Sequence, residues 1–595
     1  MNRRNTAVAV VLLVLGLVAV SMLAQNPARS GQAAATPADL VLTNGKILTV
    51  DATDSVAQAV AIAGGKIVAV GTTDAVEPYI GSKTNVVDLR GMTATPGLID
   101  THVHFTAEAA LYSIDLSNAA NMNDVLKLVR DKVATLKPGE WVSGRGWDEG
   151  KLEERRYITA ADLDKVSPNN PVYLTHTMGH YGAANTYAMK LAGITAKTPN
   201  PFGGTIDRDT QGRATGVFKE RAQQLVQRVR PQLSPEEQHR RAKNGILKLI
   251  EDFNKEGMTG AKDPGIDAQK WGIYQEVLKE KKLNVRIFAL WRVRSMETTK
   301  EAIARMQQLP RPPASLGDGL LLSGGAKIGL DGSGGARTAW MHADWSKDWT
   351  GTDTGNKGYP VIDPSEYKQM VKLLHDSGVH VSTHAIGDRG IDVTVDTYEE
   401  VLKAKPTRNL RHGIIHGNTP TDHAIDVMAR LQKTYQAGYP EAQAPFMWWI
   451  GDTYAGNLGP ARAPREKPFK TFVNKGIKWG GGSDYSVTPF EARFGLWATV
   501  ARQTLKSVYG PTPFGTTESV DIKTALRSYT IWNAYQMFLE DRIGSIEVGK
   551  DADIAVWDRN IYTIPTEQIK DIKCQMTLLK GRVVYQAARA STTQP

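Results

Sequence analysis

Short apolar runs separated by two-residue turns dominate both ends of the chain. Near the start, the apolar segments 40–43 and 46–50 flank an Asn-Gly pair, and the same alternation returns at 576–585. Two apolar runs around such a turn are typical of a β-hairpin. Because both ends share this pattern and the middle does not, we predict one small β-sandwich domain assembled from residues 37–93 and 542–590.

Between these ends, apolar runs of strand length alternate with stretches of helical periodicity. Such alternation indicates parallel βα units, and eight units suggest a closed barrel. The fold class is therefore predicted to be α/β: a distorted (β/α)₈ TIM barrel over residues 94–541, with a large insertion at 106–256 after its first strand. The expected strands are 97–104, 258–262, 285–290, 320–328, 379–385, 413–417, 433–437 and 477–484.

The first 36 residues follow a third pattern. Arg3 and Arg4 precede an almost unbroken apolar run at 7–24, and small and polar residues come next. This order is typical of a bacterial export signal, although a run of this length could also remain as an N-terminal anchor. We expect an exported protein, periplasmic or secreted, with no membrane partner beyond this segment.

Composition narrows the class of function. The net charge is +10, but Lys and Arg form no dense run, so a nucleic-acid partner is not expected. The single cysteine, Cys574, excludes an intramolecular disulfide and a zinc site built from cysteines. A small-molecule substrate is the expected partner, and a homodimer is left open.

The clearest chemical pattern is Pro-Gly-Leu-Ile-Asp-Thr-His-Val-His at 96–104. Its apolar run ends in His102 and His104. Residues two apart on a strand point to the same side, so both imidazoles can reach one metal ion.

Further potential ligands close later predicted strands. His384, His416 and Asp484 each stand at the C-terminal end of one of them. Barrel active sites are built at that face, so these side chains are predicted to converge on one site.

In this order, the segments resemble the amidohydrolase superfamily and, within it, the amidohydrolase-3 branch of YtcJ-like and N-substituted formamide deformylase-like proteins. The resemblance covers essentially everything after residue 38. Besides 96–104, the matching motifs are Lys-Ile-x-x-Asp-Gly-Ser at 327–333, Thr-His-Ala-Ile-Gly-Asp-Arg at 383–389, Ile-Ile-His at 414–416, Gly-Ser-Asp at 482–484 and Gly-Ser-Ile-Glu-x-Gly-Lys-Asp-Ala-Asp at 544–553.

The resemblance implies two divalent metal ions, with zinc favoured over manganese, iron or cobalt. It implies a carbamate on Lys327, formed with CO₂, that bridges both ions; an ordinary lysine paired with Asp331 is the alternative. The implied ligands are His102, His104 and Asp484 for the more buried ion, His384 and His416 for the second, and Lys327 for both.

The implied activity is hydrolysis of an amide-type C–N bond in an N-acyl, N-formyl or cyclic amide. Metal coordination lowers the pKa of water from about 15.7 towards about 7, giving a hydroxide nucleophile. Asp484 is the expected catalytic group, accepting the proton of the water and delivering it to the leaving nitrogen. An ester, carbamate or amidine substrate, or a non-catalytic regulatory or binding protein, remains as an alternative.

Substrate contacts are expected from four residues. His180 matches a position where the branch places a histidine over the pocket, while the segment 436–440 departs from the branch's Gln-Pro-x-His pattern. The four expected substrate-binding residues are His180, Arg337, Gln436 and Tyr439.

Overall fold

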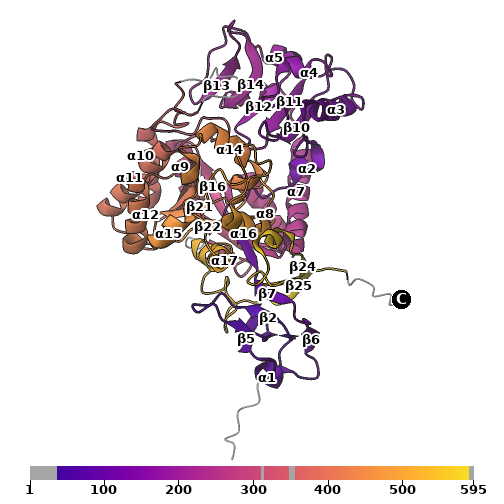
Figure 1. The fold of residues 1–595 in the computed structure, drawn as a ribbon, viewed down its shortest axis with the longest axis vertical. Helices are drawn as coiled ribbons and strands as arrows, with labels where there is room; N and C mark the ends of the chain where they lie inside the picture. The colour runs from indigo at the N-terminus through magenta and orange to yellow at the C-terminus, as the bar shows by residue number, and fades with distance from the viewer. Residues whose placement is uncertain (1–35, 310–313, 347–354, 589–595) are drawn as a thin grey trace, which may run out of the picture.

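The computed structural model describes residues 36–309, 314–346 and 355–588, arranged as three units along its long axis (Figure 1). A β unit lies at one end, a barrel in the middle and a capping unit at the other end. The predicted export signal lies outside the described residues except for its last position. Within the described ranges, no helix is long and apolar enough to cross a membrane.

The central unit is a nearly closed barrel of parallel strands, which confirms the predicted fold class. Its first and last strands share no continuous ladder, but Gly481 O accepts a hydrogen bond from Thr101 N–H at 3.0 Å. In sheet order the strands are β22 (Gly480–Gly481), β21 (Tyr439–Ala442), β20 (Gly413–His416), β19 (Val381–Ala385), β18 (Leu321–Gly329), β16 (Arg286–Val293), β15 (Met258–Ile266) and β8 (Leu98–Asp100).

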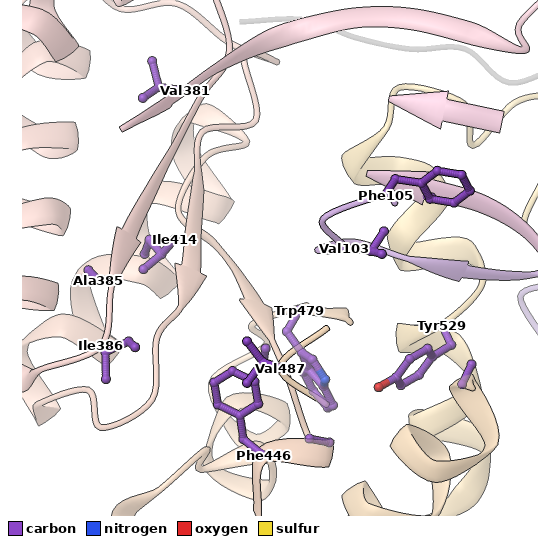
Figure 2. Close-up of a cluster of buried hydrophobic side chains, with 14 of the residues drawn as sticks. Val103, Phe105, Val381, Ala385, Ile386, Ile414, Phe446, Trp479, Val487 and Tyr529 are labelled. Atoms are coloured by element: carbon purple, nitrogen blue, oxygen red, sulfur yellow. The ribbon is translucent and has the colours of Figure 1, made fainter. Parts of the chain in front are cut away.

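Amphipathic helices cover the barrel. Their apolar faces pack on the strands, which are buried on both sides and therefore read as nearly continuous apolar runs. The buried side chains Val103, Val381, Ile414 and Trp479 come from distant parts of the chain and belong to one core (Figure 2). The main helices are α7 (Pro235–Lys255), α8 (Ala268–Lys279), α9 (Met296–Gln307), α10 (Pro364–Asp376), α11 (Asp388–Ala404), α12 (Asp422–Tyr435), α15 (Phe469–Asn474), α16 (Ala492–Ala501), α17 (Ile522–Ser528) and α18 (Ile531–Gln536).

The seventh barrel strand was predicted at the wrong place. Most of the segment 433–437 is the last turn of α12, and Gln436 caps that helix in the left-handed conformation, with φ +56°. Gly438 then turns the chain with φ +79° before β21 begins. A left-handed residue at a helix end satisfies the last carbonyls, and Leu431 holds this turn against the core, so the local β-like composition is overridden.

The insertion forms its own six-stranded mixed sheet above the barrel (Figure 1). The strand order is β13 (Gly204–Arg208), β14 (Ala214–Glu220), β12 (Tyr181–Ala184), β11 (Val172–His176), β10 (Val142–Trp147) and β9 (Ile114–Asp115). Its helices are α2 (Glu108–Tyr112), α3 (Met122–Val133), α4 (Ala160–Leu163), α5 (Thr186–Leu191) and α6 (Gln223–Gln227). Helix α7, which the expected range 106–256 includes, packs on β15 and α8 and so belongs to the barrel.

Both chain ends build the β-sandwich. Strand β23 pairs with β7 in an antiparallel ladder, with Ile554 opposite Pro96. One sheet is β25 (Arg582–Gln586), β24 (Cys574–Leu579), β23 (Ile554–Trp557), β7 (Thr93–Pro96), β2 (Lys46–Leu48) and β3 (Val56–Ala57). The other is β5 (Lys66–Gly71), β4 (Ala59–Ala63), β1 (Leu40–Thr43) and β6 (Asn85–Asp88).

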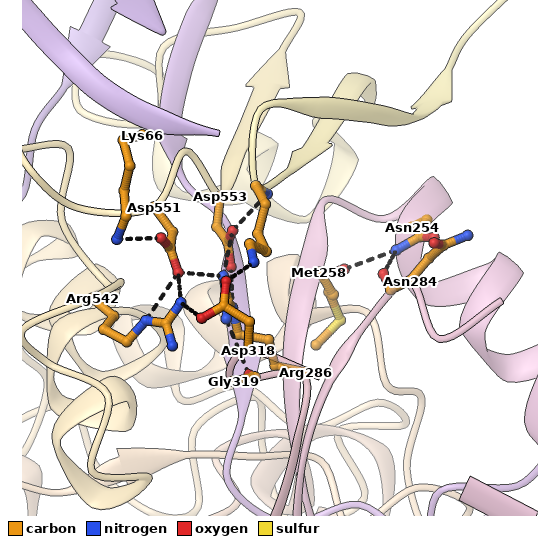
Figure 3. Close-up of polar contacts among 11 residues, drawn as sticks. Lys66, Asn254, Met258, Asn284, Arg286, Asp318, Gly319, Arg542, Asp551 and Asp553 are labelled. Atoms are coloured by element: carbon orange, nitrogen blue, oxygen red, sulfur yellow. Dashed lines mark hydrogen bonds and ion pairs between the residues drawn. The ribbon is translucent and has the colours of Figure 1, made fainter. Parts of the chain in front are cut away.

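A buried ion-pair network joins the sandwich to the barrel (Figure 3). Arg286, at the start of β16, donates from Nε to Asp553 Oδ2 at 2.6 Å and from Nη2 to Asp551 Oδ2 at 2.9 Å. Arg542 also donates to Asp551, at 2.8 Å. Because Arg286 is fully buried, its charge depends on these two carboxylates for compensation.

Replacing Arg286 with methionine is expected to lower the free energy of unfolding by about 3 kcal/mol, because two buried carboxylates lose a partner. Urea denaturation of the purified variant measures this change. The control is Arg305→Met, an exposed position on α9, which should stay within about 0.5 kcal/mol of the parent protein. An Arg286→Met midpoint equal to that of the control would contradict the role of this network.

Candidate metal centre and active site

A polar cavity of about 740 Å³ opens at the C-terminal ends of the barrel strands. The barrel supplies its floor, and the inserted sheet supplies a wall through Arg145, His180 and Glu220. All six predicted ligands line it: His102, His104, Lys327, His384, His416 and Asp484. The structure thus brings together side chains that lie up to 382 positions apart in the sequence.

Three of these side chains form a tight group. The Nε2 atoms of His102 and His104 each lie 3.2 Å from Asp484 Oδ1. Both ring nitrogens of His102 and Oδ1 of Asp484 are buried and have no hydrogen bond among the described residues. Ligands about 2.0–2.1 Å from one zinc ion at a near-tetrahedral angle lie about 3.3 Å apart. The orphaned atoms therefore fit a shared cation.

The protonation state of this group also suits a metal. Burial lowers the pKa of His102 to about 3, so its imidazole is neutral at pH 7. Burial alone would raise the pKa of Asp484, but the His102 and His104 side chains outweigh it and hold that pKa well below its ordinary value. Neutral imidazoles and an ionised carboxylate are the forms that bind metal ions.

Local backbone geometry aims Asp484 at the two histidines. Its φ is +56°, an uncommon conformation for a residue with a side chain. The preceding Ser483 donates from N–H and from Oγ to Asp100, whose Oδ1 also accepts from His102 N–H at 2.8 Å. Asp100 therefore ties the ends of β8 and β22 together, and that tie holds the strained residue in place.

A second pair of imidazoles faces the same cavity. His384 Nδ1 lies 3.0 Å from His416 Nε2. The other nitrogen of each ring already donates: His384 Nε2–H to Gly332 O at 3.0 Å, and His416 Nδ1–H to Gln443 Oε1 at 2.7 Å. Gln443 is oriented by donating its own amide N–H to Glu441 O. With neutral rings, the two facing nitrogens are both lone-pair donors, which a cation between them would satisfy.

Lys327 lies on β18 beside these groups. The expected alternative of a pair with Asp331 is not observed, and Lys327 Nζ has no hydrogen bond or ion pair within the residues described. By contrast, the fully buried Lys262 on β15 is paired with Glu441 at 2.7 Å and Ser382 at 3.0 Å. Burial lowers the pKa of Lys327 to about 8. An uncompensated, weakly basic amine of this kind fits modification better than a resident positive charge.

Asp331 has a structural task instead. Its carboxylate accepts backbone N–H groups from Trp340 at 3.0 Å, Ile386 at 3.1 Å and Gly387 at 2.9 Å. Ile386 and Gly387 lie two and three residues after His384, so Asp331 holds the chain that follows this histidine.

His180 is placed over the cavity by a carboxylate that the sequence analysis missed. Its Nδ1 lies 2.9 Å from both oxygens of Glu220, which also accepts a hydrogen bond from Thr338. Burial alone would lower the pKa of His180, but Glu220 outweighs it and raises that pKa. His180 can therefore hold a proton on Nε2, the nitrogen that Glu220 leaves free.

The structure does not bring the other three predicted substrate contacts to this cavity. Gln436 and Tyr439 lie at the N-terminal end of β21, where the hydroxyl of Tyr439 contacts that of Tyr535. Gln436 and Tyr439 line a separate cavity there. Arg337 is 1% exposed and bonds Asn457 rather than the cavity. Gln436 and Tyr439 were expected at the active site because the seventh strand was predicted too early in the chain. At the true C-terminal end of that strand, the chain presents Gln443.

Replacing Gln443 with leucine is expected to weaken binding of the second metal equivalent about 10- to 100-fold, because His416 loses the acceptor that orients it. Metal titration of the apoprotein followed by calorimetry measures this change. Gln307→Leu, on the exposed face of α9, is the matched control and should bind metal as the parent does. Equal affinities in both variants would show that Gln443 does not position His416.

Comparison with known proteins was decisive for the family. The model of the amidohydrolase family, Amidohydro_3, matches residues 85–585. The chain belongs to the amidohydrolase family. The sequence-based prediction of an enzyme of the amidohydrolase class is thereby confirmed, as is a dependence on metal.

Relatives of this amidohydrolase match along nearly their full lengths. The protein YtcJ of Bacillus subtilis is 27% identical over 519 residues, which is 86% of this chain and 92% of YtcJ. An N-substituted formamide deformylase of Arthrobacter pascens is 29% identical over 562 residues, covering 92% and 98% of the two chains. A metal-dependent hydrolase from Pyrococcus horikoshii has the same fold, with a TM-score of 0.66, 23% identity and coverage of 89% and 99%.

Proposed function

We propose that this amidohydrolase binds two divalent metal ions, most readily zinc, and hydrolyses an amide-type C–N bond of a small molecule. The observation that carries the proposal is the pair of facing nitrogens, His384 Nδ1 and His416 Nε2, each left as a lone-pair donor by a hydrogen bond on the far side of its ring. N-formyl, N-acyl and cyclic amides are the candidate substrates, and the likeness to a formamide deformylase favours N-formyl compounds.

Each ion would have its own ligands. His102, His104 and Asp484 would hold the more buried one, and His384 and His416 the second. Lys327 would serve both as a carbamate. In that modification, the neutral Nζ adds to CO₂, a proton leaves to solvent, and an anionic group with two oxygens replaces the amine. The lowered pKa of Lys327, about 8, supports the step because only the neutral amine reacts.

When bound, such ions polarise a carbonyl and lower the pKa of water towards neutrality. The Asp484 carboxylate would accept a proton from the attacking water and deliver it to the leaving nitrogen. His180, held by Glu220, would present Nε2–H to the substrate carbonyl oxygen. The wall formed by the inserted sheet would limit the entry of bulk water. Nothing here requires a serine or cysteine nucleophile.

The place of action is also a proposal. Arg3, Arg4 and the apolar run 7–24 support export from the cytoplasm, where the enzyme would meet periplasmic or external amides.

The experiment that tests the proposed function combines metal analysis with a substrate panel. Purified protein should contain about two metal ions per chain, lose activity on dialysis against a chelator and regain it with zinc. The panel contains N-formyl, N-acyl and cyclic amides, each beside the corresponding ester or carbamate. Preferential hydrolysis of an ester or carbamate would contradict the amide assignment. Two bound metals with no hydrolysis of any panel member would favour a binding or regulatory protein.

A further inference from the structure

Besides the proposed metal ligands, three solvent-exposed arginines line the active-site cavity. Arg221 directly follows β14 of the inserted sheet, Arg292 lies near the end of β16, and Arg294 follows two residues later. All three line the cavity and are exposed to it. Two different units of the fold therefore supply the group, which we name the arginine cluster.

No carboxylate neutralises the arginine cluster in the part of the chain that the structure describes. The guanidinium groups of Arg221, Arg292 and Arg294 make no ion pair and no side-chain hydrogen bond there. The acids that line the cavity are committed elsewhere: Glu220 to His180, Asp331 to backbone amides and Asp484 to the first pair of histidines. The mouth of the cavity therefore carries positive charge that the protein itself leaves uncompensated.

The arginines of the cluster lie close enough for their charges to repel one another. Arg292 is in register with Lys327 on the neighbouring strand, so its side chain leaves β16 on the same side as Lys327 leaves β18. Its guanidinium lies against Gly265, where a Cβ would come within 2.8 Å of Arg292 Nε. Burial lowers the pKa of Arg294, and the charges of Arg292 and Arg221 lower it further. A bound anion would relieve this repulsion among three like charges.

We infer that the arginine cluster is a subsite for an anionic oxygen group on the substrate, a carboxylate or a phosphate. Guanidinium groups bind both through paired N–H donors, and the cavity volume of about 740 Å³ accommodates a metabolite-sized molecule. The inference rests on the proposed function and deepens it: the substrate is an amide that bears a negative charge away from the scissile bond, such as an N-acylated or N-formylated amino acid. Neutral amides are then the poor substrates.

The test compares matched substrates on the metal-loaded enzyme. N-formyl and N-acetyl amino acids are each paired with their carboxamides and with their aminophosphonate analogues. We expect kcat/KM for the charged member to exceed that for the carboxamide by about 10- to 100-fold. The ratio should fall as sodium chloride rises from about 50 to about 500 mM, since salt screens exposed charges. The carboxylate and phosphonate arms distinguish the two anion types.

Variants locate the effect. In Arg292→Gln/Arg294→Gln the ratio of kcat/KM for the charged substrate to that for the carboxamide should fall to about one. The variant Arg221→Gln, with one substitution, should lower this ratio as well, and it serves as the test if the double variant folds poorly. The matched control is Arg305→Gln, on α9 outside the cavity, which should keep the full ratio. A ratio near one in the parent enzyme, or an unchanged ratio in the cluster variants, overturns the subsite while the proposed amide hydrolysis stands.

Failure of the proposed function can be distinguished from failure of the anion subsite. If the two-metal protein hydrolyses no amide, equilibrium calorimetry with N-formyl-leucine and N-formyl-leucinamide still tests the subsite. Tighter binding of the acid by the parent, lost in Arg292→Gln/Arg294→Gln, supports it. Equal binding of acid and amide overturns it.

Discussion

Replacing Lys327 with alanine is expected to lower kcat/KM at least about a thousandfold and to reduce the metal content from two ions per chain to at most one. The proposed carbamate would supply an oxygen to each ion, so its loss would remove a ligand from both and leave His384 and His416 as an incomplete pair. Elemental analysis of the purified variant and steady-state kinetics on the best panel substrate measure the two effects.

A control variant and a rescue experiment accompany this prediction. Lys300→Ala, at an exposed position of α9, is the control and should retain both metals and full activity. A small carboxylic acid such as propionate can fill the space left by the lysine, so it should restore part of the metal content and activity of Lys327→Ala. If the alanine variant keeps two metals and normal turnover, Lys327 is not a bridging ligand.

Replacing Asp484 with asparagine is expected to lower kcat about a thousandfold with little change in KM. Asparagine has nearly the same size and can still offer an amide oxygen to a metal, but it cannot take the proton that the reaction must move. Stopped assays over a range of substrate concentrations separate kcat from KM, and circular dichroism shows that the fold is kept.

The control for this second variant is Asp396→Asn, an exposed carboxylate on α11 that pairs with His423. It should behave as the parent enzyme does. An unchanged kcat in Asp484→Asn would rule out its role in proton transfer. Loss of one metal with proportionate loss of activity would show that Asp484 acts as a ligand alone.

Local periodicity explains why the metal centre was accessible from the sequence. His102 and His104 are two apart on a strand, and that spacing alone puts them on one side. His384, His416 and Asp484 each end an apolar run, and parallel strands in a barrel end at one face. In the structure they meet there, within 3.0–3.2 Å of their neighbours. The roles assigned to them stay predictions until metal content and kinetics are measured.

The same reasoning failed where the chain turns between elements. Residues 433–437 have the composition of a strand, but Gln436 ends α12 in a left-handed conformation. That error placed the expected C-terminal end of the seventh strand at residue 437 instead of Ala442 and pointed to Gln436 and Tyr439 instead of Gln443. Helix ends depend on what the last turn packs against, and for this helix the buried neighbours of Leu431 come from other segments.

From the sequence alone, the barrel, the sandwich built from both chain ends and the histidine and aspartate ligand candidates could be inferred, because they depend on spacing between near neighbours. Lys327 was implied by the resemblance to a known family. Glu220 behind His180, Gln443 behind His416 and the arginine cluster could not. In each case the contact joins residues that belong to different strands or to different units of the fold. Such pairings are set by how strands register and units pack, and these depend on burial summed over the whole molecule.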